Sequence, residues 1–281
     1  MKRIIIAIAL FVASYNVEAQ VKTPQPSPKA SVEQTVGLTD VAVEYSRPGM
    51  KGRTIFGDLV PFGKLWRTGA NANTTVSFSE DVVIDGKTLK KGKYALFTMP
   101  KAENWEVIFY SDTDNWGTPE EWSEAKVALR ANAKTEMLNR NVESFTIGIN
   151  GLDNNYGHLE ISWEKTLVSL KFEVPTQKTA MASIEKALAG PASNDYFSSA
   201  QYFYNSNGDM NKALEYVNKA LELNKDKPFW MNRQKSLIQA RLGDKKGAIE
   251  SAKLSLAAAT AAKNNDYVKM NTESIAEWSK K

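Results

Sequence analysis

The stretch that decides the fold is TTVSFSEDVVIDGKTLKKGKYALFTMP, residues 74–100. Short runs of alternating apolar and polar residues fill it, a pattern typical of antiparallel strands with one buried face. Asp85-Gly86 separates two of the runs and is a strong signal for a tight hairpin turn. The stretch therefore predicts a β domain built from hairpins.

The same pattern extends in both directions, from about residue 30 to residue 174. It predicts ten short strands, at residues 31–36, 41–46, 74–78, 82–84, 94–99, 105–110, 126–133, 145–150, 158–163 and 168–174. The alanine-rich run 125–133 is also compatible with a helix. Because almost no helical periodicity lies between the runs, we expect an antiparallel sandwich or a barrel-like domain at residues 30–175.

After Pro175 the composition changes to Ala, Leu, Lys and Glu, with apolar residues at helical spacing. A Gly-Asp pair at Gly208 recurs at Gly243, and Ala213 recurs at Ala248, so each feature repeats after 35 residues, close to the roughly 34-residue tetratricopeptide period. We expect an all-α domain of tetratricopeptide-like helical hairpins at residues 176–281. The fold class is then α+β with segregated domains, and a plain helical bundle is the alternative for the second one.

The N-terminus has the features of a secretory signal peptide. Met1-Lys2-Arg3 precedes an apolar run at residues 4–13, and Ala19 is the small residue that signal peptidase requires. Ten apolar residues are too few to span a bilayer, which needs roughly 20. We therefore expect cleavage after Ala19, a Pro-rich linker at residues 20–29, a periplasmic or secreted protein, and no transmembrane segment in the mature chain.

Composition narrows the function further. The 36 basic and 32 acidic side chains leave a formal net charge of +4, and no basic run is interleaved with aromatic residues, so nucleic acid is not an expected partner. The chain has no cysteine, which excludes thiol catalysis, thiolate metal ligands and a lipid-modified cysteine.

The densest set of chemically distinctive side chains lies between two expected strands. Residues 45–71 read YSRPGMKGRTIFGDLVPFGKLWRTGAN, and ordered loops of this length are often functional. Arginine can bind carboxylate or phosphate, tryptophan offers a stacking surface and asparagine offers an amide. The candidate ligand-binding residues are Arg47, Arg53, Trp66, Arg67, Asn71 and, in another loop, Trp116.

The same side chains also have a structural interpretation. The arginines would then pair with Asp58, Glu44 or backbone carbonyls, and Trp66 would plug the end of the sandwich. The sequence leaves both interpretations open, because a ligand-binding arginine and a paired one look alike in it.

Other suggestive motifs are incomplete. Asp112-Thr113-Asp114-Asn115-Trp116-Gly117 begins like a calcium loop, but its fifth position is Trp116 and its twelfth is Ser123, where a glutamate belongs. His158 is the single histidine, too few for a zinc site, and we expect it to be structural. We expect no cofactor and no bound metal.

Several motifs together resemble the domain-of-unknown-function 2911 family of bacterial exported proteins, over about residues 27–174. They are Ser27-Pro28, Gln34, Gly37, Tyr45-Ser46-Arg47-Pro48, Lys51-Gly52-Arg53, Phe56-Gly57, Trp66-Arg67-Thr68-Gly69-Ala70-Asn71, Gly92-Lys93-Tyr94 and Trp116-Gly117. The helical tail looks like an extension that many members carry. The resemblance implies a β-rich domain and a secreted or periplasmic location, and it implies no activity, catalytic residue or cofactor.

The sequence favours a non-catalytic envelope protein with two binding regions. The loop at residues 45–71 would hold a small anionic or sugar ligand, and the helical tail would hold a protein or peptide partner. The alternative is a hydrolase of envelope carbohydrate or ester that uses carboxylates in residues 112–124. A third alternative is an assembly factor, which would have no pocket and a large apolar patch on its tail.

Overall fold

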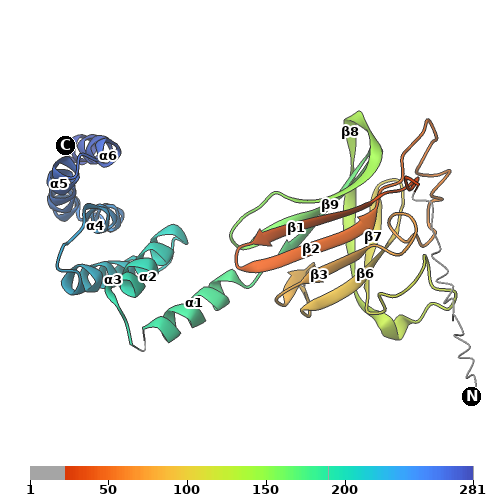
Figure 1. Cartoon of the computed structure of the whole chain (residues 1–281), viewed down its shortest axis with the longest axis horizontal. Helices are drawn as coiled ribbons and strands as arrows, with labels where there is room; N and C mark the ends of the chain where they lie inside the picture. Colours follow the sequence, from red (N-terminus) through yellow and green to blue (C-terminus); the bar gives the residue numbers. More distant parts are fainter. Residues whose placement is uncertain (1–22, 189, 281) are drawn as a thin grey trace, which may run out of the picture. The chain divides into compact units, whose positions relative to one another are not determined.

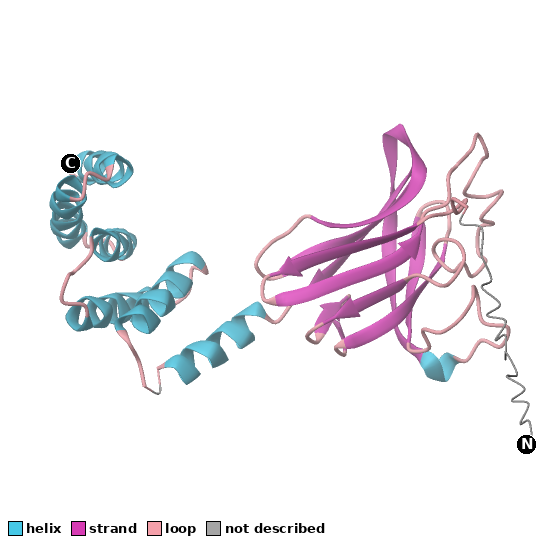
Figure 2. Cartoon of the chain, viewed as in Figure 1, coloured by secondary structure: helices cyan, strands magenta, loops and turns pink. Residues whose placement is uncertain are grey.

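The computed structural model describes residues 23–188 and 190–280 (Figure 1). The chain divides after Val174 into two compact units, the first built from strands and the second from helices (Figure 2). The expected fold class is confirmed. The expected signal peptide lies outside the described residues.

The first unit is an antiparallel sheet whose strand order is β1-β2-β3-β6-β7-β8-β9-β4-β5. Because β1 and β5 are the two ends of this order and are not paired with each other, the sheet is an open sandwich, and the barrel-like alternative is wrong. The strands are β1 (Lys29–Val36), β2 (Thr39–Ser46), β3 (Thr75–Phe78), β4 (Val82–Ile84), β5 (Lys87–Leu89), β6 (Gly92–Met99), β7 (Asn104–Tyr110), β8 (Val127–Asn150) and β9 (Tyr156–Glu173).

The expected turn at Asp85-Gly86 is present. Asp85 and Gly86 both have positive φ, 49° and 72°, and Ile84 pairs with Lys87 across the turn. Two positive φ angles are what a two-residue hairpin turn of the I′ type requires.

In two places, two strands that the sequence predicted separately are joined in one continuous strand. β8 contains both 126–133 and 145–150 apart from Lys126, and β9 contains both 158–163 and 168–174 apart from Val174. Register shifts between Met137 and Thr146 let β8 bend, so that it pairs with β7 in one layer and with β9 in the other. Residues 134–144 lie mostly exposed, and their apolar alternation is therefore lost although the strand continues. The alanine-rich run is a strand, with Leu129, Ala131 and Ala133 buried on one face.

The core between the layers contains aliphatic side chains and two groups of contacting rings. One group comprises Phe78, Tyr94, Phe109 and Phe172, and the larger group lies at the end where the long β2–β3 loop lies. There, five rings contact one another at centroid distances of 4.8–6.4 Å, from Phe56, Trp66, Trp105, Phe145 and Trp163. The loop packs against the core through this aromatic cluster.

The second unit contains six helices among the described residues: α1 (Thr176–Ala187), α2 (Ser193–Asn205), α3 (Met210–Leu223), α4 (Phe229–Arg241), α5 (Lys245–Ala261) and α6 (Asn265–Trp278). The repeated Gly-Asp pair marks helix starts, because Asp209 and Asp244 cap α3 and α5 with their carboxylates. Ala213 and Ala248 are fully buried, so the small residues of the repeat lie where helices meet. None of the described helices is long and apolar enough to cross a membrane.

Candidate functional site

The loop between β2 and β3 closes the aromatic end of the sandwich and is held by backbone hydrogen bonds. Met50 N–H donates to Glu143 O at 2.7 Å, and Phe145 N–H donates to Pro48 O at 3.0 Å. Trp66 and Thr98 exchange two bonds, of 2.8 and 2.9 Å. The loop is therefore ordered at both its beginning and its end, as a binding loop must be to hold side chains in place.

Trp66 is half-buried and belongs to the aromatic cluster. Its ring is stacked on Trp163, with centroids 6.1 Å apart and an interplanar angle of 15°, and it meets Phe56, Trp105 and Phe145 edge-on. Trp66 thus packs against the core and also contributes to the wall of a pocket above it.

Three of the candidate residues donate hydrogen bonds that hold the loop in shape. Arg47 Nε donates to Phe145 O at 2.9 Å and its Nη2 donates to the Thr146 hydroxyl at 2.7 Å. Arg53 donates to the carbonyls of Met50 and Gly49. The Asn71 amide donates to Ser27 O at 3.2 Å and to the Ser46 hydroxyl at 3.4 Å. Arg47 and Arg53 therefore bond backbone carbonyls, which is one of the pairings that the structural interpretation of the sequence expected. Glu44, another expected partner of the arginines, is ion-paired with Lys93 instead.

Arg67 differs from these three. Its Nε is buried and has no hydrogen-bond partner, and in the described part of the chain no carboxylate forms an ion pair with it. The guanidinium lies against the backbone of Gly117, where an added Cβ would be 3.5 Å from Arg67 Nη1. A Cβ at that position would be in ordinary van der Waals contact with the guanidinium, and it is the positive φ of 96° that favours glycine there.

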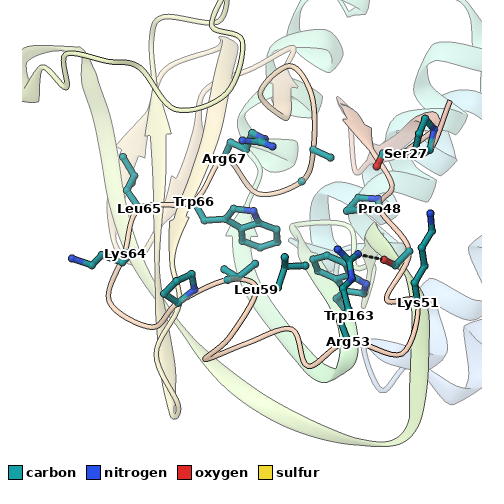
Figure 3. A pocket seen from close by; sticks show the side chains of 16 residues that line it. Ser27, Pro48, Lys51, Arg53, Leu59, Lys64, Leu65, Trp66, Arg67 and Trp163 are labelled. Carbon is teal, nitrogen blue, oxygen red and sulfur yellow. Dashed lines mark hydrogen bonds between the residues drawn. The ribbon is translucent and has the colours of Figure 1, made fainter.

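A pocket of about 400 Å³ opens between these residues, a size within the range of small-molecule sites. Its apolar wall includes Trp66, Trp163 and Leu59, and Figure 3 shows the Trp66 ring between Arg67 on one side and Trp163 with Arg53 on the other. The basic side chains in the lining are those of Lys51, Arg53, Lys64 and Arg67, and no acidic residue of the described chain is among the lining residues.

Trp116 does not line this pocket, although the segment that carries it touches Arg67. Its side chain is 81% exposed. Trp122, the other tryptophan of that segment, is stacked on Tyr110 with ring centroids 4.4 Å apart and covers Phe97. It therefore covers the outer face of the β6–β7 pair.

Sequence reasoning did not single out Lys51, Leu59 or Lys64 as site residues, and it placed Trp163 in the core only. It also passed over Asn73, whose amide nitrogen and oxygen are both buried without a partner. Lysines and asparagines of loops are common on any surface, so only the folded loop distinguishes these positions. Trp163 lies in an alternating strand run, and nothing in that run indicates that its edge reaches a pocket.

Two of the five carboxylates in residues 112–124, the region proposed for hydrolysis, are ion-paired. Asp112 bonds Lys126 at 2.7 Å, and Glu124 bonds Arg130 at 2.7 Å and accepts from Trp122 Nε1. The hydrogen bond from Lys126 lowers the pKa of Asp112, and the hydrogen bond from Arg130 lowers the pKa of Glu124. A general acid needs a raised carboxyl pKa, so neither group is suited to that role at neutral pH.

The residues that the structure describes contain no cluster of side chains suited to metal binding or to histidine-based catalysis. No group of three or more His, Asp or Glu side chains there is placed to hold a metal ion. His158 Nδ1 lies 3.3 Å from Gly151 O and its ring meets Tyr156 edge-on, so its contacts are local to the turn between β8 and β9.

The fold and the pocket together define an antiparallel β-sandwich protein with a basic pocket at its loop end and a helical-hairpin extension. The sequence pattern of DUF2911, a family described as proteins of unknown function, matches residues 27–172, more than half of the chain. The chain belongs to this family, and the expected resemblance is confirmed. The matched region runs from just before β1 almost to the end of β9, so the helical unit lies outside it. Comparison with curated proteins and with solved structures finds no match.

Proposed function

We propose that the β unit binds a small anionic ligand in the pocket above Trp66, and that the protein is an exported binding protein of the bacterial envelope. The observation that carries the proposal is the charge of the lining, which holds four basic side chains and no acidic one among the described residues. These positive charges would attract an anion into the cavity.

Arg67 is the residue that we expect to contact the anion. A buried donor without a partner costs free energy, and a carboxylate or phosphate oxygen would satisfy it with a charge-assisted hydrogen bond. The other candidate arginines are already bonded to the protein, so they shape the pocket more than they bind. The wall formed by Trp66 and Leu59 favours an anion that also carries a ring or another apolar body.

The test is a thermal-shift titration of the chain that begins at Gln20, with cyclohexanecarboxylate and inorganic phosphate as probes and cyclohexanol as the neutral control. A ligand at about 100 times its Kd stabilises the folded state by roughly 2.7 kcal/mol. We expect a rise in the unfolding midpoint with an anion, none with cyclohexanol, and loss of the rise in Arg67→Gln.

Lys253→Gln is the matched control, because it removes one exposed positive charge from α5 in the other unit. It should keep the full anion response. If neither anion raises the midpoint, or if Arg67→Gln responds like the wild type, the pocket is not an anion site.

Export rests on the N-terminal pattern, a basic start, ten apolar residues and Ala19. Expression of the full chain in a bacterial host should give a periplasmic or secreted product whose first residue is Gln20. Ala19→Arg should block this cleavage, because signal peptidase requires a small residue. A cytoplasmic product that retains residue 1 would contradict export.

A protein or peptide partner for the helical unit stays a prediction. Trp230, which is 41% exposed at the start of α4, is the side chain that we expect such a partner to cover. Crosslinking in the host should then give a discrete larger species with the wild type and less of it with Trp230→Ala, while Leu254→Ala, an exposed apolar change on α5, should have no effect. Identical crosslinking of all three proteins would contradict a contact at Trp230.

A further inference from the structure

The helical unit carries a half-buried arginine that has no carboxylate partner. Arg233 lies on α4, and in the described part of the chain no Asp or Glu forms an ion pair with it. Burial lowers the pKa of Arg233, and the groups that raise it, Tyr204 and Tyr267, are not carboxylates. Charged side chains that are withdrawn from water are usually paired with an opposite charge, so Arg233 lacks the partner that its position favours.

Arg233 uses only one of its nitrogens within the protein. Nη1 donates to Ser274 Oγ at 3.0 Å and to Asn271 Oδ1 at 3.5 Å, both on α6. Among the described residues, Nε and Nη2 have no hydrogen-bond acceptor, and neither is one of the buried unpartnered atoms, so both face solvent. Nε and Nη2 carry the parallel N–H groups with which an arginine holds a carboxylate through two hydrogen bonds.

Two arginines of the β2–β3 loop use the same pair of donors differently. In Arg47, Nε donates to Phe145 O and Nη2 donates to the Thr146 hydroxyl. In Arg53, both nitrogens donate to backbone carbonyls. The protein itself therefore occupies the donors of these two side chains, whereas the corresponding donors of Arg233 are open.

Hydrogen bonds behind Arg233 hold its guanidinium in place. Asn271 is fully buried, and its amide nitrogen donates to Ser255 Oγ and to Tyr267 O, both at 2.8 Å. Ser255 donates in turn to Phe229 O at 2.8 Å. The two donations fix the orientation of the Asn271 amide, so that its oxygen faces Arg233. Side chains of α5 and α6 thus position the arginine of α4, as the supporting contacts of a binding site do.

An aromatic surface adjoins the open donors. Trp230 precedes Arg233 by three residues on α4, so the two side chains lie on the same face of the helix, and Trp230 is 41% exposed. The ring of Phe229 contacts Trp230 at a centroid distance of 5.0 Å and Tyr267 at 4.7 Å. The surface formed by α4 and α6 therefore places a cation beside aromatic rings, which complements an acidic side chain next to an apolar one.

We propose that Arg233 binds the carboxylate of an Asp or Glu side chain in a peptide segment whose neighbouring apolar residue covers Trp230. This names the chemistry of the partner proposed for the helical unit and rests on that proposal. Charge complementarity selects an acidic segment, because the open donors belong to a cation without a carboxylate partner. The exposed tryptophan selects a peptide, because a small carboxylate would fill the donors of Arg233 and leave the ring uncovered.

The experiment is the selection of peptides from a random library displayed on phage, with the chain that begins at Gln20 as the target. We expect Asp and Glu to be enriched beside an apolar residue. The enrichment of acidic residues should disappear with Arg233→Gln and persist with Arg67→Gln, which changes the pocket of the β unit.

A selected peptide is then synthesised with Glu or with Gln at its acidic position, and its affinity is measured by fluorescence anisotropy. We expect the Gln peptide to bind the wild type at least about tenfold more weakly than the Glu peptide, because hydrogen bonds between charged groups contribute that much to affinity. With Arg233→Gln, both peptides should bind equally and as weakly as the Gln peptide binds the wild type.

Lys235→Gln is the matched control. It removes one positive charge from the same helix, but two residues along α4 and therefore about 200° around it. This variant should keep the tenfold preference for the Glu peptide. If Arg233→Gln does not fold, Arg233→Lys gives the comparison, because it keeps the charge, loses the parallel donors and should therefore weaken the preference.

Three outcomes would overturn the carboxylate site: a selection without acidic enrichment, equal binding of the two peptides to the wild type, or a preference that depends on Arg67 and not on Arg233. Peptides that lose their binding with Trp230→Ala but not with Arg233→Gln would overturn the site while still supporting a partner surface at Trp230. If no selected peptide depends on Trp230 or on Arg233, the proposed partner surface fails and the carboxylate site fails with it.

Discussion

The two halves of the β2–β3 loop use the same kinds of side chain in opposite ways. In the first half, residues 47–60, the polar side chains Arg47 and Arg53 donate to acceptors of the protein. In the second half, residues 66–73, Arg67 and Asn73 have buried polar atoms with no partner, and Trp66 packs on the core. The side chains of Arg47 and Arg53 therefore help to hold the first half in shape. The second half is also hydrogen-bonded, through the Trp66 backbone and the Asn71 amide, but its Arg67 and Asn73 side chains keep buried polar atoms without a partner.

This difference shows why residue type alone does not identify a binding residue. Arg47 and Arg67 are equally prominent in the sequence, and each lies beside an aromatic ring or a glycine-rich turn. What separates them is whether an acceptor of the fold lies within reach. Phe145 O is 2.9 Å from Arg47 Nε, and Arg67 Nε has no such acceptor.

The largest expected effect tests the apolar anchor of the second half. Trp66→Ala should destabilise the β unit by about 3 kcal/mol, because it removes a ring that contacts four others. Trp116→Ala, at an 81% exposed side chain, should change stability by no more than about 0.5 kcal/mol. Denaturant unfolding measures both. A loss below about 1 kcal/mol for Trp66→Ala would mean that another contact holds the second half.

A smaller effect should separate the two arginines. Arg47→Met keeps most of the aliphatic chain and removes two hydrogen bonds, so we expect a loss of about 2 kcal/mol in the free energy of unfolding. Arg67→Met removes a buried unpartnered donor and should leave stability within about 0.5 kcal/mol of the wild type, or raise it. Equal losses in the two variants would remove the distinction between the halves.

Much of the fold was predictable, because it depends on local patterns. Asp85-Gly86 has the turn chemistry of a hairpin, and the 35-residue spacing of Gly208 and Gly243 places the caps of α3 and α5. The continuity of β8 was not predictable, because residues 134–144 are mostly exposed and alternation disappears where no face is buried. The pattern reports burial, and it reports a strand only when one face of the strand is buried.

The candidate site was predictable only as a region. The many chemically distinctive side chains of residues 45–71 indicate the loop that lines the pocket. Which of these side chains bond to the protein and which have no partner depends on contacts between distant parts of the chain. Arg47 reaches β8, nearly a hundred residues away, and Gly117 comes from the segment after β7. Neither contact has a signature in one sequence, so Asn73, which depends on the same segment, was missed.

The smallest expected effect concerns the segment that covers the second half. Lys126 lowers the pKa of Asp112, so the ion pair contributes stability above the unfolded carboxyl pKa of about 3.9, and this contribution is lost as pH falls through the lower folded value. At the alkaline end, the raised pKa of Lys126 keeps the pair intact until pH exceeds the usual lysine value of about 10.4.

Asp112→Asn should therefore lower the unfolding midpoint slightly at pH 7, and this effect should disappear as pH falls through the lowered pKa of the wild-type carboxyl group. Hydrogen exchange at the Asn73 N–H, which bonds Asn115 O, should be faster in the variant at pH 7, because the segment has lost one of its anchors. Arg47→Met is the contrast, since its lost bonds end on a carbonyl and a hydroxyl that do not titrate in this range. The difference in unfolding midpoint between Arg47→Met and the wild type should therefore stay constant with pH. If the effect of Asp112→Asn is also independent of pH, the ion pair with Lys126 does not anchor the segment.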